Sequence, residues 1–256
     1  MSRPFDNSKH YNQLIADWYD LLLKDETFDI QFYKKIVMNS GKPVLELACG
    51  TGRLLIEYLK AGIDIDGLDS SKPMLEKCKN KARESGLKTT LYHQKIEDME
   101  LKRKYKTMFA AGGSFQLLDT FEKAMQALKK IHNNLEPGGQ LVLDLFIPWE
   151  QLLAQQEGVW RLGRTGTRGN LTFAAHQSEV FDLKNQVIKG KTRYELYENY
   201  KLKETYFDSL NLKWYSFNEF KLMLEKTGFV DIKTEAKHLI SKHGEATVYY
   251  ASKKLS

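Results

Sequence analysis

Residues 44–54 read V-L-E-L-A-C-G-T-G-R-L, and this stretch decides the fold of the chain. A short apolar strand runs into a loop that contains Gly50 and Gly52, and a helical pattern follows. Glycine has no Cβ, so the backbone of such a loop can turn sharply and approach a ligand closely. The first N–H groups of the next helix have no partner within the helix and can face that ligand. The stretch therefore predicts the binding turn of an α/β unit.

A second apolar run, residues 63–68, ends in Asp69, which lies 19 residues after Gly50. A carboxylate at the end of the strand beside a glycine loop can accept hydrogen bonds from both hydroxyls of a ribose. The loop and Asp69 together predict a nucleoside-binding site.

Strand and helix patterns alternate through the first 146 residues. Helices are predicted over residues 11–23, 29–38, 53–60, 72–85 and 121–135, and strands over residues 44–47, 63–68, 89–93, 107–111 and 141–146. Pro73 in the first turn of one helix and Gly86 just beyond its end are start and stop signals. This rhythm predicts a Rossmann-like α/β fold, a mostly parallel sheet with helices on both faces.

The pattern changes after this part. Residues 171–214 are rich in β-branched and aromatic residues without a helical period, which predicts three or four antiparallel strands. Ser216 and Glu219 form a capping box that opens a helix to about residue 227. Two final strands, residues 230–236 and 247–252, complete a predicted seven-stranded sheet. The chain is therefore predicted to be one α/β domain with an inserted antiparallel β-sheet.

The composition of the chain limits which kinds of protein and which partners are expected. The chain has 256 residues, 42% hydrophobic and 28% charged, which is ordinary for a soluble globular protein. The net charge is +6, but the lysines are scattered, so we expect a solvated surface and no nucleic-acid partner. Cys49 lies in the glycine loop and Cys78 has no metal-type spacing to it, so no structural disulfide is expected. No signal core or membrane-length apolar run is evident, and we expect a cytoplasmic protein. The histidines are not grouped, and no metal is expected.

Three motifs identify a family resemblance. They are E-x-A-x-G-x-G over residues 46–52, G-L-D-S-S-K-P-M-L over residues 67–75 and L-E-P-G-G-Q-L over residues 135–141. In this order and spacing they resemble class I S-adenosylmethionine-dependent methyltransferases. A dinucleotide dehydrogenase would need a third glycine at the position of Leu55. Residues 18–20, 113–118 and 214–216, with the insert, are similar to bacterial small-molecule methyltransferases, including the sugar N-methyltransferase type.

The resemblance implies a site for S-adenosylmethionine. Glu46 would face the amino group of the methionine part, Asp69 would hold the ribose hydroxyls, and Ser70 and Met74 would flank the adenine. The implied cofactor-binding set is Tyr11, Tyr19, Glu46, Ala48, Cys49, Gly50, Gly52, Asp69, Ser70, Met74, Lys95, Ile96 and Ala110. Plainer roles stay open for five of them: Glu46 as a surface carboxylate, Asp69 as a helix cap, Met74 as core, and Tyr11 and Tyr19 as helix packing.

The chain departs from the family at one position. An acidic residue that accepts a hydrogen bond from the adenine amino group is expected after the third strand, and Lys95 stands there. A lysine side chain cannot accept this bond. Adenine would then be bound by the backbone of Ile96, with Glu97 or Asp98 as a substitute acceptor.

The resemblance implies methyl transfer by in-line displacement to nitrogen or oxygen of a small metabolite. It divides the chain into lid helices (1–42), a cofactor-binding core (43–150 and 215–256) and an insert on the acceptor side (151–214). Positioning is the main requirement, and no single catalytic residue is identified. The candidates are Tyr19, Ser114, Phe115 and His176, with Glu179 and Tyr194 as further bases in the insert.

Two other functions stay open. A nucleic-acid methyltransferase would be expected to carry an N/D-P-P-Y/F or Pro-Cys signature, and the segment after the fourth strand, A-A-G-G-S-F, has neither. A cofactor-binding protein without catalysis is the other. We expect no membrane partner and a monomer or homodimer.

Overall fold

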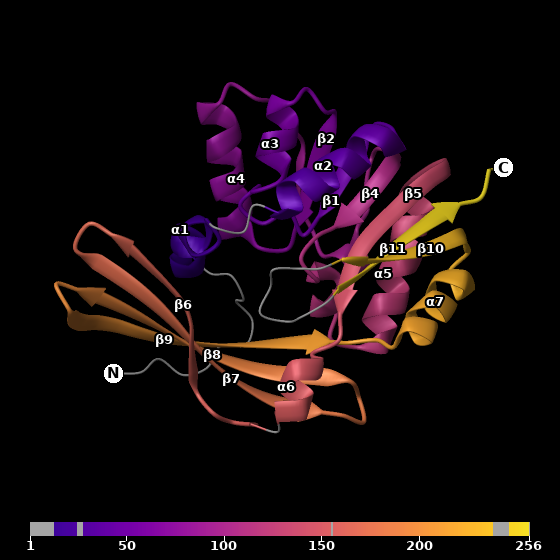
Figure 1. The fold of residues 1–256 in the computed structure, drawn as a ribbon. Helices are drawn as coiled ribbons and strands as arrows, with labels where there is room; N and C mark the ends of the chain where they lie inside the picture. Colours follow the sequence, from indigo (N-terminus) through magenta and orange to yellow (C-terminus); the bar gives the residue numbers. More distant parts are fainter. Residues whose placement is uncertain (1–12, 25–27, 155, 238–245, 256) are drawn as a thin grey trace.

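The structure, a computed structural model, describes residues 13–24, 28–154, 156–237 and 246–255. A large sheet has the strand order β10-β11-β5-β4-β1-β2-β3, and a separate four-stranded sheet has the order β6-β7-β8-β9 (Figure 1). The strands of the large sheet are β1 (Val44–Leu47), β2 (Ile65–Asp69), β3 (Leu91–His93), β4 (Tyr105–Ala110), β5 (Leu135–Phe146), β10 (Phe229–Lys237) and β11 (Ala246–Lys253). Strands β1 to β5 pair in parallel, whereas β10 and β11 are antiparallel. The predicted seven-stranded, mostly parallel sheet is confirmed.

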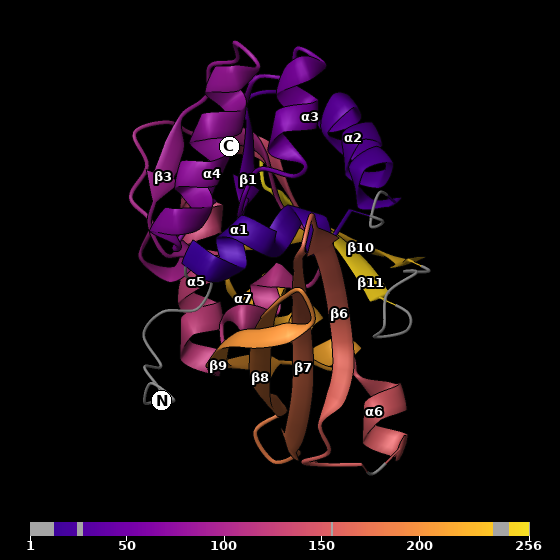
Figure 2. The same ribbon diagram turned by 90° about the vertical axis from the view of Figure 1, so that its left-hand side faces the viewer.

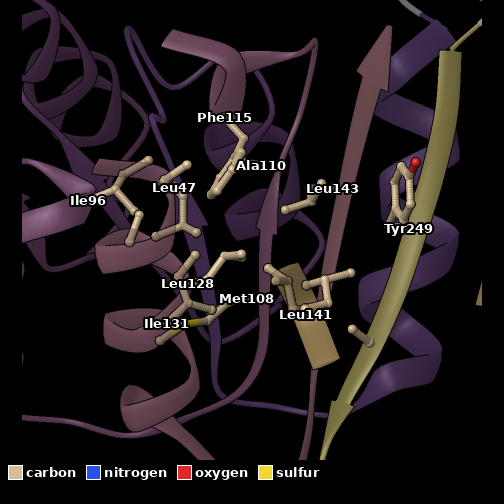
Figure 3. Packing of buried hydrophobic residues seen from close by; sticks show 14 of the residues in the cluster. Leu47, Ile96, Met108, Ala110, Phe115, Leu128, Ile131, Leu141, Leu143 and Tyr249 are labelled. Carbon is tan, nitrogen blue, oxygen red and sulfur yellow. The ribbon is translucent and has the colours of Figure 1, made fainter. Parts of the chain in front are cut away.

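Helices cover both faces of this sheet, as predicted. They are α2 (Phe28–Ser40), α3 (Leu55–Lys60) and α4 (Lys72–Glu84) on one face, and α5 (Phe121–Asn134) and α7 (Phe217–Lys226) on the other. Because strand side chains alternate between faces, Leu45 and Leu47 of β1 join the core under α5, and Val44 joins the core under α2 and α3. Figure 3 shows the first of these cores, where Leu128 and Ile131 of α5 face Met108 and Leu141 of the sheet.

The antiparallel sheet, here called sheet B, consists of β6 (Arg161–Arg168), β7 (Leu171–Asp182), β8 (Val187–Glu198) and β9 (Lys201–Lys213). The prediction of an antiparallel insert is confirmed, but its first strand begins ten residues earlier than residue 171. This strand was missed because R-L-G-R-T-G-T-R is polar and lies at an exposed edge, where no buried face imposes alternation. The short helix α6 (Trp149–Ala154), which leads into sheet B, was also not predicted.

Helix α1 (Gln13–Leu22) lies between α4 and the ends of β6 and β7 (Figure 2). Its Trp18 ring stacks on Phe173 of β7 at 5.3 Å, and the guanidinium of Arg168 of β6 lies over the Trp18 ring at 5.0 Å. Asp17 forms an ion pair with Lys77 of α4 at 2.5 Å. Helix α1 thus contacts both a helix that covers the large sheet and the strands of sheet B. No helix of the described part of the chain is long and apolar enough to cross a membrane.

Candidate functional site

The glycine loop after β1 has an unusual backbone. Ala48, Gly50 and Gly52 have φ values of 54°, 55° and 78°. This left-handed conformation costs a residue with a Cβ roughly 1–2 kcal/mol, so Ala48 occupies a position that suits glycine. At Gly52 the neighbours add a second restriction, since a Cβ there would lie 2.5 Å from the Cys78 sulfur of α4. The loop therefore packs against α4 at Gly52, where a side chain would not fit.

Asp69 ties this loop to the start of α4. One carboxylate oxygen accepts a hydrogen bond from the Gly50 N–H at 2.8 Å, and the other from the Ser71 N–H at 2.7 Å. Burial raises the pKa of Asp69, and the two amides oppose that rise. Ser71 is the residue that caps α4, because its hydroxyl accepts from the Met74 N–H. Asp69 therefore holds the glycine loop to the start of α4.

Glu46 carries a buried acceptor that lacks a partner. The residue is 4% exposed, and its Oε2 has no hydrogen bond. Burial raises the pKa of Glu46 well above its usual value, while the field of Arg53 and an N–H of Leu55 act in the opposite direction. An unpaired buried carboxylate oxygen is costly. An added hydrogen-bond donor beside the glycine loop would satisfy this oxygen.

Helix α1 closes over this region. Met74 is 2% exposed and packs against Ile15 and Ala16. Asp20 accepts a hydrogen bond from the Thr51 hydroxyl of the glycine loop at 2.6 Å, and it pairs with Lys81 of α4 at the same distance. The structure thus places Met74 beneath α1. Tyr11 lies outside the described residues.

Lys95, which follows β3 at the position where an acidic residue was expected, is more exposed than the residue after it. Lys95 is exposed and precedes a short 3-10 helix, η1 (Ile96–Asp98), without a side-chain cap. Ile96 is buried, and Asp98 accepts from Gln126. Ser70 is exposed, and its carbonyl contacts the ring of His93 at 3.0 Å.

A cavity of about 300 Å³ opens beside the glycine loop. Its walls are α1, Arg53, the segment 111–114 after β4 and the inner face of sheet B. Tyr19 and Ser114, two of the predicted catalytic candidates, line it. The other two do not: Phe115 is fully buried against Phe220, and His176 contacts Glu195 at 3.1 Å on the opposite face of β7. Ala110 is also buried, at the end of β4.

The inner face of sheet B brings distant residues into rows. The register pairs Gln177 with Thr192 and Thr192 with Asp208, so one polar row crosses three strands. The next row is Glu179, Gly190 and Leu210. All six line the cavity. Sequence reasoning found Glu179 but missed the rest, although period-2 alternation along each strand was a usable signal.

Comparison with known proteins places the glycine-loop region in a family. Residues 44–139 match a family described as methyltransferase domain. This part of the chain is similar to methyltransferase domains. This is the class to which the three motifs pointed. The described residues contain no group of three or more His, Cys, Asp or Glu side chains that could hold a metal ion.

Relatives extend the likeness to particular proteins. The chain is 30% identical over 141 residues to the dTDP-3-amino-3,4,6-trideoxy-alpha-D-glucopyranose N,N-dimethyltransferase of Streptomyces venezuelae, a match that covers 52% of this chain and 56% of that protein. The chain spans about half the length of the curated relatives that it matches first.

Solved structures establish the fold over nearly the whole chain. An S-adenosylmethionine-dependent methyltransferase from Clostridium acetobutylicum has a TM-score of 0.74 and 19% identity, and the match covers 94% of this chain and 98% of that one. An amino pentose methyltransferase from Micromonospora echinaspora, solved with bound cofactor, has a TM-score of 0.70 and 16% identity, with coverage of 97% and 100%. Sheet B is thus part of the fold that this chain shares with these structures.

Proposed function

We propose that the protein transfers a methyl group from S-adenosylmethionine to nitrogen or oxygen of a small metabolite. The observation that carries the proposal is the buried, unpartnered Oε2 of Glu46 beside a loop with three left-handed residues. An α-ammonium group would satisfy that oxygen, and the carboxylate of Asp69 is suited to the ribose. The residues present therefore fit the cofactor. When bound, it supplies an electrophilic methyl group on a sulfonium.

The chain's own part in the reaction is positioning and the exclusion of water. Helix α1 and sheet B cover the cavity, so an acceptor held there would be shielded from solvent. We assign residues 1–42 to the lid, residues 43–150 and 215–256 to cofactor binding, and residues 151–214 to the acceptor. The backbone of Ile96 is assigned to the adenine, because Lys95 cannot accept its hydrogen bond.

We further propose that the acceptor atom is an amine nitrogen. Asp208 is 7% exposed on the cavity floor, and Glu179 faces the same cavity from β7. Both can accept hydrogen bonds from an amine. Burial raises the pKa of Glu179, which suits it to take up the proton that the amine must release. The relative from S. venezuelae is named as an N,N-dimethyltransferase of an amino sugar, which supports this choice.

Binding and turnover test the proposal in sequence. Calorimetry should show binding of S-adenosylmethionine and not of NAD; the reverse result would overturn the assignment. Formation of S-adenosylhomocysteine should then be measured with matched panels of small amines and alcohols. Turnover with alcohols alone would contradict the amine assignment. Binding without turnover on any acceptor, with tRNA included at two salt concentrations, would favour a non-catalytic role.

A further inference from the structure

Sheet B is inserted between β5 and α7, so the chain enters it at one junction and leaves it at another (Figure 1). The entry junction follows Phe146, the last residue of β5, and the exit junction follows Lys213, the last residue of β9. Phe146 and Leu212 line the cavity at these two strand ends. The junctions are therefore where the chain itself fixes sheet B to the rest of the fold, next to the candidate site.

One buried side chain bonds to both junctions. Gln116 lies in η2 (Ser114–Leu117), a 3-10 helix just after β4, and is fully buried. Its Nε2 donates to the Phe146 carbonyl at 2.9 Å and to the Lys213 carbonyl at 3.1 Å, and its Oε1 accepts from the Phe146 N–H at 2.9 Å. The amide has one orientation, because turning it over would place its nitrogen against an N–H and its oxygen against two carbonyls.

The three segments that Gln116 joins form walls of the same cavity. Residues 111–114 line it beside the glycine loop, and Asp208 of β9 lines it on sheet B. Gly113 has a φ of 69°, and a Cβ there would lie 2.8 Å from the Phe146 ring and 3.1 Å from the Gln116 Oε1. The backbone after β4 thus packs directly on the junction. Gln116 therefore relates the wall beside the glycine loop to the wall that carries Asp208.

We propose that Gln116 is a positioning residue, which holds sheet B at the distance and angle from the donor site that methyl transfer requires. This inference rests on the proposed function, in which Asp208 and Glu179 of sheet B bind the acceptor amine. In-line displacement needs the nitrogen on the axis of the sulfur–methyl bond, and a misplacement of about 1 Å can lower the rate on the order of 100-fold. Because Gln116 is fully buried and does not line the cavity, it acts through the backbone of β5 and β9.

A purely structural role for Gln116 would be to satisfy three buried backbone groups. Loss of such bonds lowers the folded fraction, so the number of S-adenosylhomocysteine sites and the rate would fall together. Loss of positioning instead leaves folded molecules that bind both ligands and react slowly. Trp18 of α1 still stacks on Phe173 of β7 when Gln116 is replaced, so sheet B stays attached. The kcat per binding site therefore separates the two roles.

The test combines calorimetry of S-adenosylhomocysteine with initial-rate kinetics on the full chain, using the small amine that the unaltered protein methylates fastest. Gln116→Met keeps the length of the side chain and removes its three hydrogen bonds. We expect kcat per binding site to fall by about 30- to 100-fold. The Kd of S-adenosylhomocysteine and the KM of the amine should stay within about threefold, because the wall that binds each ligand is unchanged.

A milder variant covers the case in which Gln116→Met does not fold. Gln116→Asn keeps an amide that is one methylene shorter and reaches only part of its partners, so kcat per binding site should fall by about tenfold. The matched control is Thr107→Val, which removes a buried hydrogen bond of 2.9 Å to the Gly41 carbonyl at the amino end of β4. It should lower the Tm and leave kcat per binding site unchanged.

Two results would overturn the inference and leave the proposed function standing. The first is an unchanged kcat per binding site in Gln116→Met, or in Gln116→Asn where only that variant folds. The second is a loss of rate that is matched by an equal loss of S-adenosylhomocysteine sites. If the unaltered protein methylated no amine, the proposed function would be overturned and the inference with it.

Discussion

The glycine-loop end of the large sheet and the inner face of sheet B are built in different ways. The loop is shaped mainly by its backbone: it has three left-handed residues, and the N–H groups of Gly50 and Ser71 donate to Asp69. On sheet B the cavity is lined by side chains such as Gln177, Thr192 and Asp208, which come from β7, β8 and β9. A backbone-built site requires fixed residues at fixed spacing, whereas a side-chain-built site can change one residue at a time. The proposed donor side is therefore constrained, and the proposed acceptor side is adjustable.

The largest effect is expected at Asp69, which serves both the loop and the predicted ribose. Asp69→Ala removes the acceptor of the Gly50 and Ser71 amides as well as the ribose contact, so we expect affinity for S-adenosylhomocysteine to fall by about 100-fold or more. Calorimetry measures this directly. Asp64→Ala, at the opposite end of the same strand, is the matched control. Affinity within about twofold of the unaltered protein would show that the loop is not the donor site.

The acceptor side should respond separately. Asp208→Asn is expected to raise KM for the amine acceptor by about tenfold, the effect of weakening one charged hydrogen bond, and to leave affinity for S-adenosylhomocysteine unchanged. Initial-rate kinetics test the change in KM, and calorimetry tests the affinity for S-adenosylhomocysteine. Glu198→Gln, an exposed carboxylate at the end of β8, should change neither. If His176→Ala abolished turnover while Asp208→Asn did not, the acceptor would lie on the His176 face of sheet B, and the assignment of the Asp208 face to the acceptor would be wrong.

Glu46 gives an intermediate effect with a defined pH dependence. Its raised pKa means that the folded, ligand-free protein holds a proton that the unfolded chain has released. Stability from this group is therefore lost as pH rises from the usual carboxyl range through the raised pKa. Glu46→Gln should increase the Tm of the ligand-free protein, by about 2–4 °C per kcal/mol, and the increase should be larger at pH 8 than at pH 4.

The affinity for S-adenosylmethionine should change with pH in the direction opposite to the stability. An ammonium ligand favours the ionised carboxylate, so affinity in the unaltered protein should rise with pH over the same interval and then level off. Glu46→Gln should bind about tenfold more weakly at high pH and show a flat profile. A Tm increase with unchanged affinity would mean that Glu46 is a strained core residue and not a ligand contact.

The contrast between the backbone-built loop and the side-chain-built cavity also explains which features could be predicted from the sequence. The large sheet, the cap at Ser71 and the glycine loop were predictable because each depends on local chemistry at a fixed position. The cavity floor was not, because Asp208 and Thr192 meet only through the register of β8 and β9. Arg53 was read as the start of a helix, and only the fold brings Asp29 to it. The polar edge strand β6 was not predicted, because it has no buried face that would impose an alternating pattern.

The smallest effect concerns α1, which contacts both regions. Asp20 holds the lid through Thr51 and Lys81 with an exposed carboxylate. Exposed pairs contribute about 0.2–1 kcal/mol each, so Asp20→Ala should increase the dissociation rate of S-adenosylhomocysteine by about two- to fivefold in stopped-flow measurements. High salt should bring the unaltered protein toward the variant's rate. Glu57→Ala, which breaks an exposed pair with Lys60 on α3, is the control. An unchanged rate for Asp20→Ala would mean that α1 does not gate the donor site, and the two regions would then be coupled only through Gln116 and the ligands they share.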